Sequence, residues 1–280
     1  MAATLLFSAC RENKEWTIHG TFDIPDTIQY GDTFLVTPSL DGMRIYLVSL
    51  SGDDCLDSTV VADGSFTFSG TVEEPRMCYV ACEFSIGTIV LEPGTINVIM
   101  SETFEATGTP NNDGITALEG RMAEFNETIR GKLLELQANA EALTPEGQDS
   151  VRMLMYGVMV EYGELVNQMI DSTAEAHPDD FVGVYAWNLR LNSADDSETL
   201  DSMLVSASDF VRNSEAVSVR RAYLSGLLMD EDFYPEDFGL EGDGEPEGPE
   251  GPEGPKESDG PEGPRGSAFY DDDFWAEPVR

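Results

Sequence analysis

The sequence has few basic residues and almost no histidine. Of 280 residues, 15 are Lys or Arg and 2 are His, against 54 Asp or Glu, which gives a net charge of -39. Most faces of such a chain repel nucleic acid, itself a polyanion, so we expect no nucleic-acid partner. His19 and His177 lie far apart and lack suitable neighbours for a zinc site or a hydrolytic triad. We therefore expect neither a metal site nor a cofactor.

Long apolar runs and redox motifs are missing as well. The nearest approach to a membrane span, residues 151–170, is interrupted by one arginine and two glutamates. Thiol-disulfide exchange usually relies on Cys-x-x-Cys at a helix start, whereas Cys78 and Cys82 have three residues between them in a strand-like segment. Glycine-rich phosphate-binding motifs are also absent. These absences favour a protein that is not an enzyme.

Residues 15–110 are expected to form an antiparallel β-sandwich or a partly open barrel. Apolar and polar residues alternate there in short segments, separated by turn pairs such as Asp41-Gly42 and Pro93-Gly94. The clearest case is the stretch Asp57–Gly70, in which two alternating segments meet at Asp63-Gly64, a pair typical of two-residue hairpin turns. Because no helical crossover fits between the segments, the pattern favours antiparallel strands.

Residues 111–228 are expected to form a small helical bundle, so the fold class is α+β. Apolar residues recur at intervals of three and four from Ile115 to Leu143, and again from Val151 to Met169. Thr144-Pro145 supplies a helix N-cap followed by proline at the first helical position, so the two helices should pair antiparallel. A further helix is expected to begin after the segment 177–180.

Three methionines stand close together in the second apolar pattern: Met153, Met155 and Met159. Such a group is compatible with a soft-metal site or an adaptable peptide-binding surface. We interpret it as core packing, because methionine fills irregular gaps on helix faces.

Residues 229–280 are expected to form a disordered acidic tail. Gly, Pro and Glu dominate this stretch, which cannot bury enough apolar surface to offset the entropy of ordering it. Its Gly-Pro-Glu triplets are too few and too interrupted for a triple helix, so an extended spacer is expected. Aromatic residues near its end form a candidate partner-docking motif: Phe269, Tyr270, Phe274 and Trp275.

The four cysteines suggest different roles. The tripeptide Ser8-Ala9-Cys10 resembles the lipobox of bacterial lipoproteins, which makes Cys10 a candidate lipidation site and residues 1–14 a truncated lipoprotein signal and tether. Cys78 and Cys82 would share a strand face about 13 Å apart, too far for a disulfide. Cys55 can reach one of them across a strand pair, or all three can remain free thiols.

Several motifs together resemble a known but uncharacterised domain. The hairpin of 57–70, Leu91-Glu92-Pro93-Gly94 and Gly108-Thr109-Pro110-Asn111-Asn112 are similar to the β-rich domain that precedes the thioredoxin domain in thiol-disulfide oxidoreductase lipoproteins of Bacteroides-type bacteria. The resemblance extends roughly over residues 16–228. Where the thioredoxin domain would follow, this sequence has its Gly/Pro/Glu repeat, so none of the family's redox residues carries over.

These observations lead to one functional hypothesis and one alternative. The first is a non-catalytic lipoprotein of the cell envelope, on the periplasmic or outer-membrane side, that contacts the membrane through a lipid anchor. It would bind an unidentified envelope protein or ligand, or act as a scaffold. The alternative is an accessory or degenerate thiol-disulfide oxidoreductase that works with a separate thioredoxin-like partner.

Overall fold

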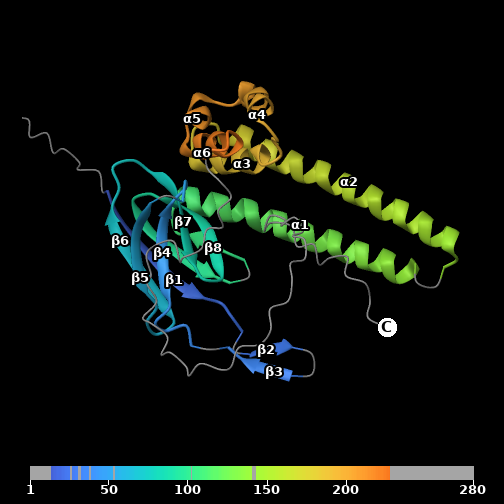
Figure 1. Cartoon of the computed structure of the whole chain (residues 1–280), viewed down its shortest axis with the longest axis horizontal. Coiled ribbons are helices and arrows are strands. Elements are labelled where there is room, and N and C mark those ends of the chain that lie inside the picture. The colour runs from blue at the N-terminus through green and yellow to red at the C-terminus, as the bar shows by residue number, and fades with distance from the viewer. Residues whose placement is uncertain are drawn as a thin grey trace, which may run out of the picture. The chain divides into compact units, whose positions relative to one another are not determined.

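The computed structural model describes residues 14–25, 27–30, 33–37, 39–52, 54–101, 103–140 and 143–227. These residues all lie within one compact unit. They form two four-stranded sheets and a small two-stranded sheet, followed by helices (Figure 1). The fold is therefore α+β, as predicted.

The first sheet has the strand order β10-β9-β1-β6. Its members are β1 (Glu15–Phe22), β6 (Ser65–Thr71), β9 (Gly94–Met100) and β10 (Glu105–Thr107). β1 lies antiparallel to β6 but parallel to β9, whereas β9 and β10 are antiparallel. The prediction of antiparallel pairing thus holds except at the centre of this sheet.

The second sheet has the order β5-β4-β7-β8 and is antiparallel throughout. Its members are β4 (Arg44–Ser49), β5 (Cys55–Val60), β7 (Arg76–Cys82) and β8 (Ser85–Leu91). The separate hairpin consists of β2 (Thr27–Tyr30) and β3 (Thr33–Val36).

The two four-stranded sheets enclose one apolar core. Residues from both sheets contribute to it, including Ile18, Phe66, Val80, Ile89 and Ile96, each at most 3% exposed. Each sheet retains two edge strands, so the sheets do not close on themselves. The predicted sandwich is therefore confirmed, and the sheets are not closed into a barrel.

The turn at Asp63-Gly64 forms as predicted and is closed by a single bridge between Ala62 and Ser65, but β5 and β6 do not pair with each other beyond it. Both residues have positive φ, 51° and 68°, as a type I′ turn requires. Val61, 2% exposed, donates its N–H to the carbonyl of Met43 at 2.9 Å. β5 therefore stays with β4, while β6 pairs with β1 in the other sheet. The predicted hairpin is in fact a corner where the chain changes sheets.

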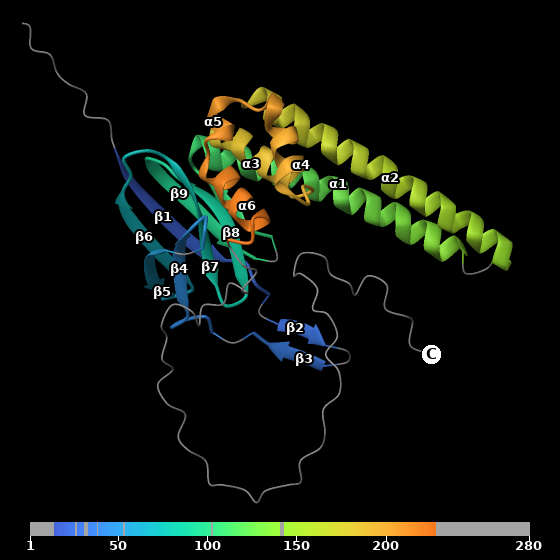
Figure 2. The ribbon, with the colours of Figure 1, turned by 45° about the horizontal axis from the view of Figure 1, so that its top comes forward.

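The helices follow the order the sequence predicts, with two long helices first. They are α1 (Pro110–Ala140), α2 (Pro145–Ala176), α3 (Phe181–Leu191), α4 (Ser197–Met203), the 3₁₀ turn η1 (Leu204–Ser206), α5 (Asp209–Arg212) and α6 (Glu215–Leu224) (Figure 2). The rings of Phe125 and Tyr162 stack with centroids 5.4 Å apart, which confirms that α1 and α2 pack along each other. Thr144 caps α2 through Gly147 N–H, also as predicted.

The helices and the second sheet share a second apolar core. Met77 of β7 and Val90 of β8 pack with Leu118 of α1 and with Val184 and Trp187 of α3. Because successive side chains of a strand point to opposite faces, one face of this sheet joins the sandwich core and the other joins the helical core. The regions predicted as a β-sandwich and a helical bundle therefore meet through continuous packing.

Candidate functional site

Asn112 joins α1 to the edge of the second sheet. Its side chain is 1% exposed, and its Oδ1 accepts the N–H of Val90 at 2.9 Å. Its Nδ2 donates to the carbonyl of Val90 at 2.8 Å and to Thr109 Oγ1 at 2.7 Å. β8 is an edge strand, so this amide occupies the place of a further strand and satisfies the polar groups of Val90.

The hydrogen bonds of Asn112 form a joint between α1 and β8, and Glu92 and Asn111 extend this joint to α3. The carboxylate of Glu92, 7% exposed, accepts the backbone N–H of Asn111 at 2.9 Å and its Nδ2 at 2.7 Å. The Oδ1 of Asn111 accepts the N–H of Phe181, the first residue of α3, at 3.0 Å. Two of the three motifs on which the family resemblance rests, 91–94 and 108–112, are thus brought together, and their polar groups hold α1 and α3 to the end of β8.

A half-buried acid that the sequence did not indicate lies in the same helical layer. The carboxylate of Glu119 on α1 accepts the hydroxyl of Tyr185 on α3 at 2.5 Å. Burial raises the pKa of Glu119, and burial followed by the charge of Glu119 raises the pKa of Tyr185. The pair adds a second polar contact between α1 and α3.

The described cysteines are all free thiols, and two of them are core residues. Cys78, 0% exposed, and Cys82, 6% exposed, lie on the face of β7 that lines the sandwich core, while Cys55 is exposed. Burial raises the pKa of Cys78 to about 12 and also raises the pKa of Cys82. The thiolate, which is the reactive form, is therefore disfavoured at both positions.

The strand order keeps Cys55 away from Cys78. Cys55 lies opposite Val48 of β4, and Val48 lies opposite Tyr79 of β7. Two strand spacings, about 9.5 Å, separate β5 from β7. A disulfide needs Cα atoms within about 7 Å, so the predicted cross-strand alternative does not form.

The other predicted site residues lie outside the described residues. They are the candidate lipidation site Cys10 and the candidate docking residues Phe269, Tyr270, Phe274 and Trp275. The predicted acidic tail from residue 229 onward lies outside them as well, so each of these assignments remains a prediction.

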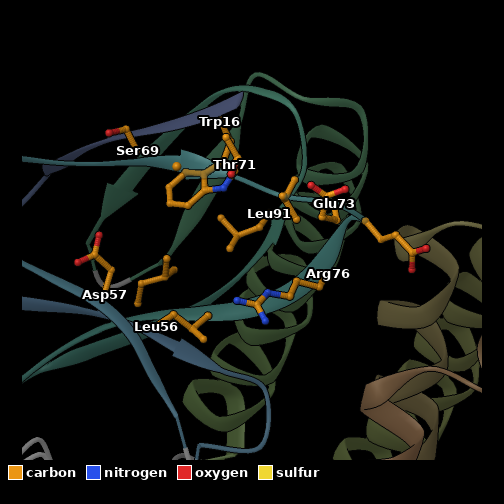
Figure 3. A pocket seen from close by; sticks show the side chains of 12 residues that line it. Trp16, Leu56, Asp57, Ser69, Thr71, Glu73, Arg76 and Leu91 are labelled. Atoms are coloured by element: carbon orange, nitrogen blue, oxygen red, sulfur yellow. The ribbon is translucent and has the colours of Figure 1, made fainter. Parts of the chain in front are cut away.

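A pocket of about 450 Å³ opens where β5 and β6 diverge into opposite sheets (Figure 3). We call it the sandwich mouth. Its lining combines an apolar group with charged residues at the rim. The apolar group is Trp16, Leu47, Leu56, Val72 and Leu91, and the charged residues are Asp57, Glu73, Glu74 and Arg76.

Trp16 places a buried polar atom at this pocket. The residue is 7% exposed, and its indole Nε1 has no hydrogen-bond partner among the described residues. Gly70 lies opposite Trp16 in the strand register, and a Cβ added there would stand 2.6 Å from Trp16 Cζ2. Glycine at position 70 is therefore what allows the indole to lie across β6.

A β-bulge shapes the opposite wall. Leu47 pairs with Asp57 and Val48 pairs with Cys55, so Leu56 is the extra residue on β5. Bulges bend a strand locally and redirect its side chains. Here the bulge brings both Leu56 and Asp57 to the sandwich mouth.

A second candidate surface lies on α2. Met153 is 71% exposed, Tyr156 68% and Val160 45%, and their spacing of three and four residues puts them on one face of the helix. We call these three residues the outer stripe. Val151, 9% exposed, belongs to the other face, which packs on α1. Met153 and Met159, 48% exposed, are surface residues, so their interpretation as core packing is wrong.

In the described part of the chain, none of the helices is long and apolar enough to cross a membrane. Nor does this part contain a group of three or more His, Cys, Asp or Glu residues positioned to hold a metal ion.

Comparison with known proteins gives one result. Residues 14–114 match the model of a domain of unknown function (DUF4369). The match spans the ten strands that the described residues form and the beginning of α1. No curated protein and no solved structure matches the chain. The sequence-based expectation of an uncharacterised β-rich domain is thereby confirmed for residues 14–114.

Proposed function

We propose that the protein is a non-catalytic binding or scaffold module of the cell envelope, and that the outer stripe of α2 binds its partner. The exposure of Met153, Tyr156 and Val160 carries this proposal. Exposed apolar residues that lie next to one another on a protein surface mark interaction sites. Methionine adapts readily to different partners, and tyrosine contributes a large contact area at low entropic cost.

The charges around the outer stripe indicate the kind of partner. Glu146 and Asp149 precede the stripe on α2, and Glu161 and Glu164 follow it. Arg152 forms an ion pair with Asp149 at 3.0 Å, which offsets part of this negative charge. An apolar strip bordered by acids complements a basic amphipathic helix, which would lay its apolar face along α2.

Binding of such a helix should depend on the outer stripe. A synthetic amphipathic Leu/Lys helix is expected to bind the full chain, and Met153→Glu or Val160→Glu should each weaken it by roughly tenfold, because a carboxylate then enters the apolar contact. Fluorescence anisotropy of the labelled peptide measures the affinity. Asn126→Glu, which adds the same charge at an exposed position of α1, is the matched control. Equal affinity for all three variants, or equal binding of a scrambled peptide, would contradict the assignment.

The envelope location is supported by the lipobox-like Ser8-Ala9-Cys10 and by the sequence resemblance to a domain that precedes thioredoxin domains in envelope lipoproteins. In this proposal Cys10 carries the lipid that attaches the protein to a membrane. A lipid chain gains about 0.8 kcal/mol for each CH₂ group that it buries.

Replacement of Cys10 tests the anchor directly. In a bacterium with lipoprotein processing, the chain expressed behind a lipoprotein signal peptide that ends at Cys10 should be found with membranes and should incorporate labelled palmitate. Cys10→Ser should abolish the label and move the protein to the soluble fraction. Cys55→Ser, at an exposed thiol of β5, should change neither result. Palmitate incorporation by Cys10→Ser would refute the anchor.

The alternative of thiol-disulfide exchange has less support. The pKa of Cys78 is raised to about 12 by burial, and burial also raises the pKa of Cys82 and of the exposed Cys55. Exchange requires a thiolate to attack, and each of these shifts lowers the thiolate fraction at neutral pH. We therefore favour binding over redox chemistry.

A further inference from the structure

We propose that the sandwich mouth binds a short apolar peptide with a free carboxyl terminus. This site is distinct from the outer stripe of α2 and does not depend on the function proposed for it. Four features of the pocket carry the inference: its position between two edge strands, an unpartnered N–H, a facing guanidinium and an apolar wall.

The topology explains why the pocket exists. β5 precedes the turn at Asp63-Gly64 and β6 follows it. The two strands belong to different sheets, and each is an edge strand of its sheet. Their ends farthest from the turn, at Leu56 and Thr71, therefore border an opening into the sandwich. Edge strands carry backbone groups that can pair with an added peptide.

The indole of Trp16 provides a specific hydrogen-bond donor. Its Nε1 is buried and has no acceptor among the described residues. A buried N–H without a partner costs free energy, and a ligand oxygen that reaches it removes that cost. A peptide carbonyl that reached the indole would supply such an acceptor.

Arg76 provides the charge that selects a carboxylate. Figure 3 shows its side chain extending from β7 into the pocket, across from Trp16 on β1. A guanidinium binds a carboxylate through two parallel hydrogen bonds. Of the acids at the rim, Glu73 forms an ion pair with Lys14, while Asp57 and Glu74 add negative charge. These acids complement the ammonium group at the other end of a short peptide.

The apolar wall and the size of the pocket limit the ligand further. Leu47, Leu56 and Leu91 form a surface for aliphatic side chains. The volume of about 450 Å³ lies in the lower part of the range for small-molecule sites, about 300–1,000 Å³. The net charge of -39 disfavours a simple anion, whereas a zwitterionic peptide carries no net charge. A dipeptide such as Leu-Leu meets all these conditions.

Titration of the ¹⁵N-labelled full chain with Leu-Leu tests the site. The indole N–H signal of Trp16, assigned by its loss in Trp16→Phe, should move downfield as it gains an acceptor, while the signal of Trp187 on α3 stays in place. Leu-Leu amide lacks the carboxylate and should bind at least roughly tenfold more weakly. Arg76→Gln should lower the affinity for Leu-Leu by a similar factor.

Two controls separate binding from folding. Arg130→Gln removes a charge from an exposed position on α1 and should leave the affinity unchanged. Trp16→Phe removes the indole N–H together with part of a buried side chain, so its thermal unfolding midpoint is measured first to confirm that the variant is folded. The folded variant should bind Leu-Leu measurably more weakly by calorimetry. The inference is overturned if millimolar Leu-Leu leaves the Trp16 signal unmoved, if the amide binds equally well, or if Arg76→Gln retains full affinity.

Discussion

Asn112→Ala is expected to lower the free energy of unfolding by about 3–5 kcal/mol. The substitution removes the side chain that bonds to both the N–H and the carbonyl of Val90. Each buried polar group left without a partner costs about 1–3 kcal/mol. Val90 is 0% exposed, so water cannot replace the lost bonds without opening the joint between α1 and β8. Urea unfolding followed by circular dichroism measures the change.

The same chain offers a control for Asn112. Asn126→Ala lies at an exposed position further along α1 and should change stability by no more than about 0.5 kcal/mol. Hydrogen exchange of the Val90 amide gives a local readout, because that N–H should exchange faster only in Asn112→Ala. A stability loss below about 1 kcal/mol in Asn112→Ala would show that the joint does not hold α1 to the sheet.

Gly183→Ala is expected to destabilise the protein by about 2–4 kcal/mol. A Cβ at this position would stand 1.6 Å from the carbonyl oxygen of His177, so the backbone between α2 and α3 must move. The movement would disturb the cap formed by Asp180, whose Oδ1 accepts the N–H of Gly183 at 3.1 Å. Overpacking that forces the backbone to shift costs about 1–3 kcal/mol, and loss of a cap adds to it. The thermal unfolding midpoint should fall accordingly.

Two other glycines serve as controls for this prediction. Gly157 and Gly163 lie within α2, and a Cβ at either position would meet nothing within 4 Å. Alanine there should stabilise the protein by about 0.5–1 kcal/mol, because alanine favours the helix more than glycine does. If Gly183→Ala also stabilised the protein, the close approach of His177 would not limit the residue at position 183.

The repeating patterns in the sequence were sufficient to predict most elements but not how the strands pair. The alternation around Phe66 and Phe68 predicts a strand, and the positive φ of Asp63 and Gly64 follows from their residue types. The same local pattern fits a paired hairpin and a corner between two sheets equally well. The choice depends on Val61 bonding to Met43, a contact between residues that no local pattern specifies.

The candidate sites were less predictable than the fold. The cysteines are visible in any sequence, whereas the burial that raises the pKa of Cys78 depends on both sheets. The sandwich mouth combines Trp16 of β1 with Arg76 of β7, residues that become neighbours only after the sandwich assembles. The outer stripe is visible in the sequence, because its three residues repeat at helical spacing on a face of α2 other than that of Val151.

The parallel pairing of β1 with β9 has a consequence for how the chain folds during synthesis. β1 is the first strand of the sandwich to be made, yet its partners are β6, with Ile18 opposite Phe68, and β9, with Trp16 opposite Gly94. It lies between these two strands in the sheet and has no neighbour until residues far along the chain emerge. Contacts of such long sequence separation slow folding. β1 must therefore stay unpaired until β6 has left the ribosome, and its parallel pairing with β9 must wait until nearly all of the sandwich has been made.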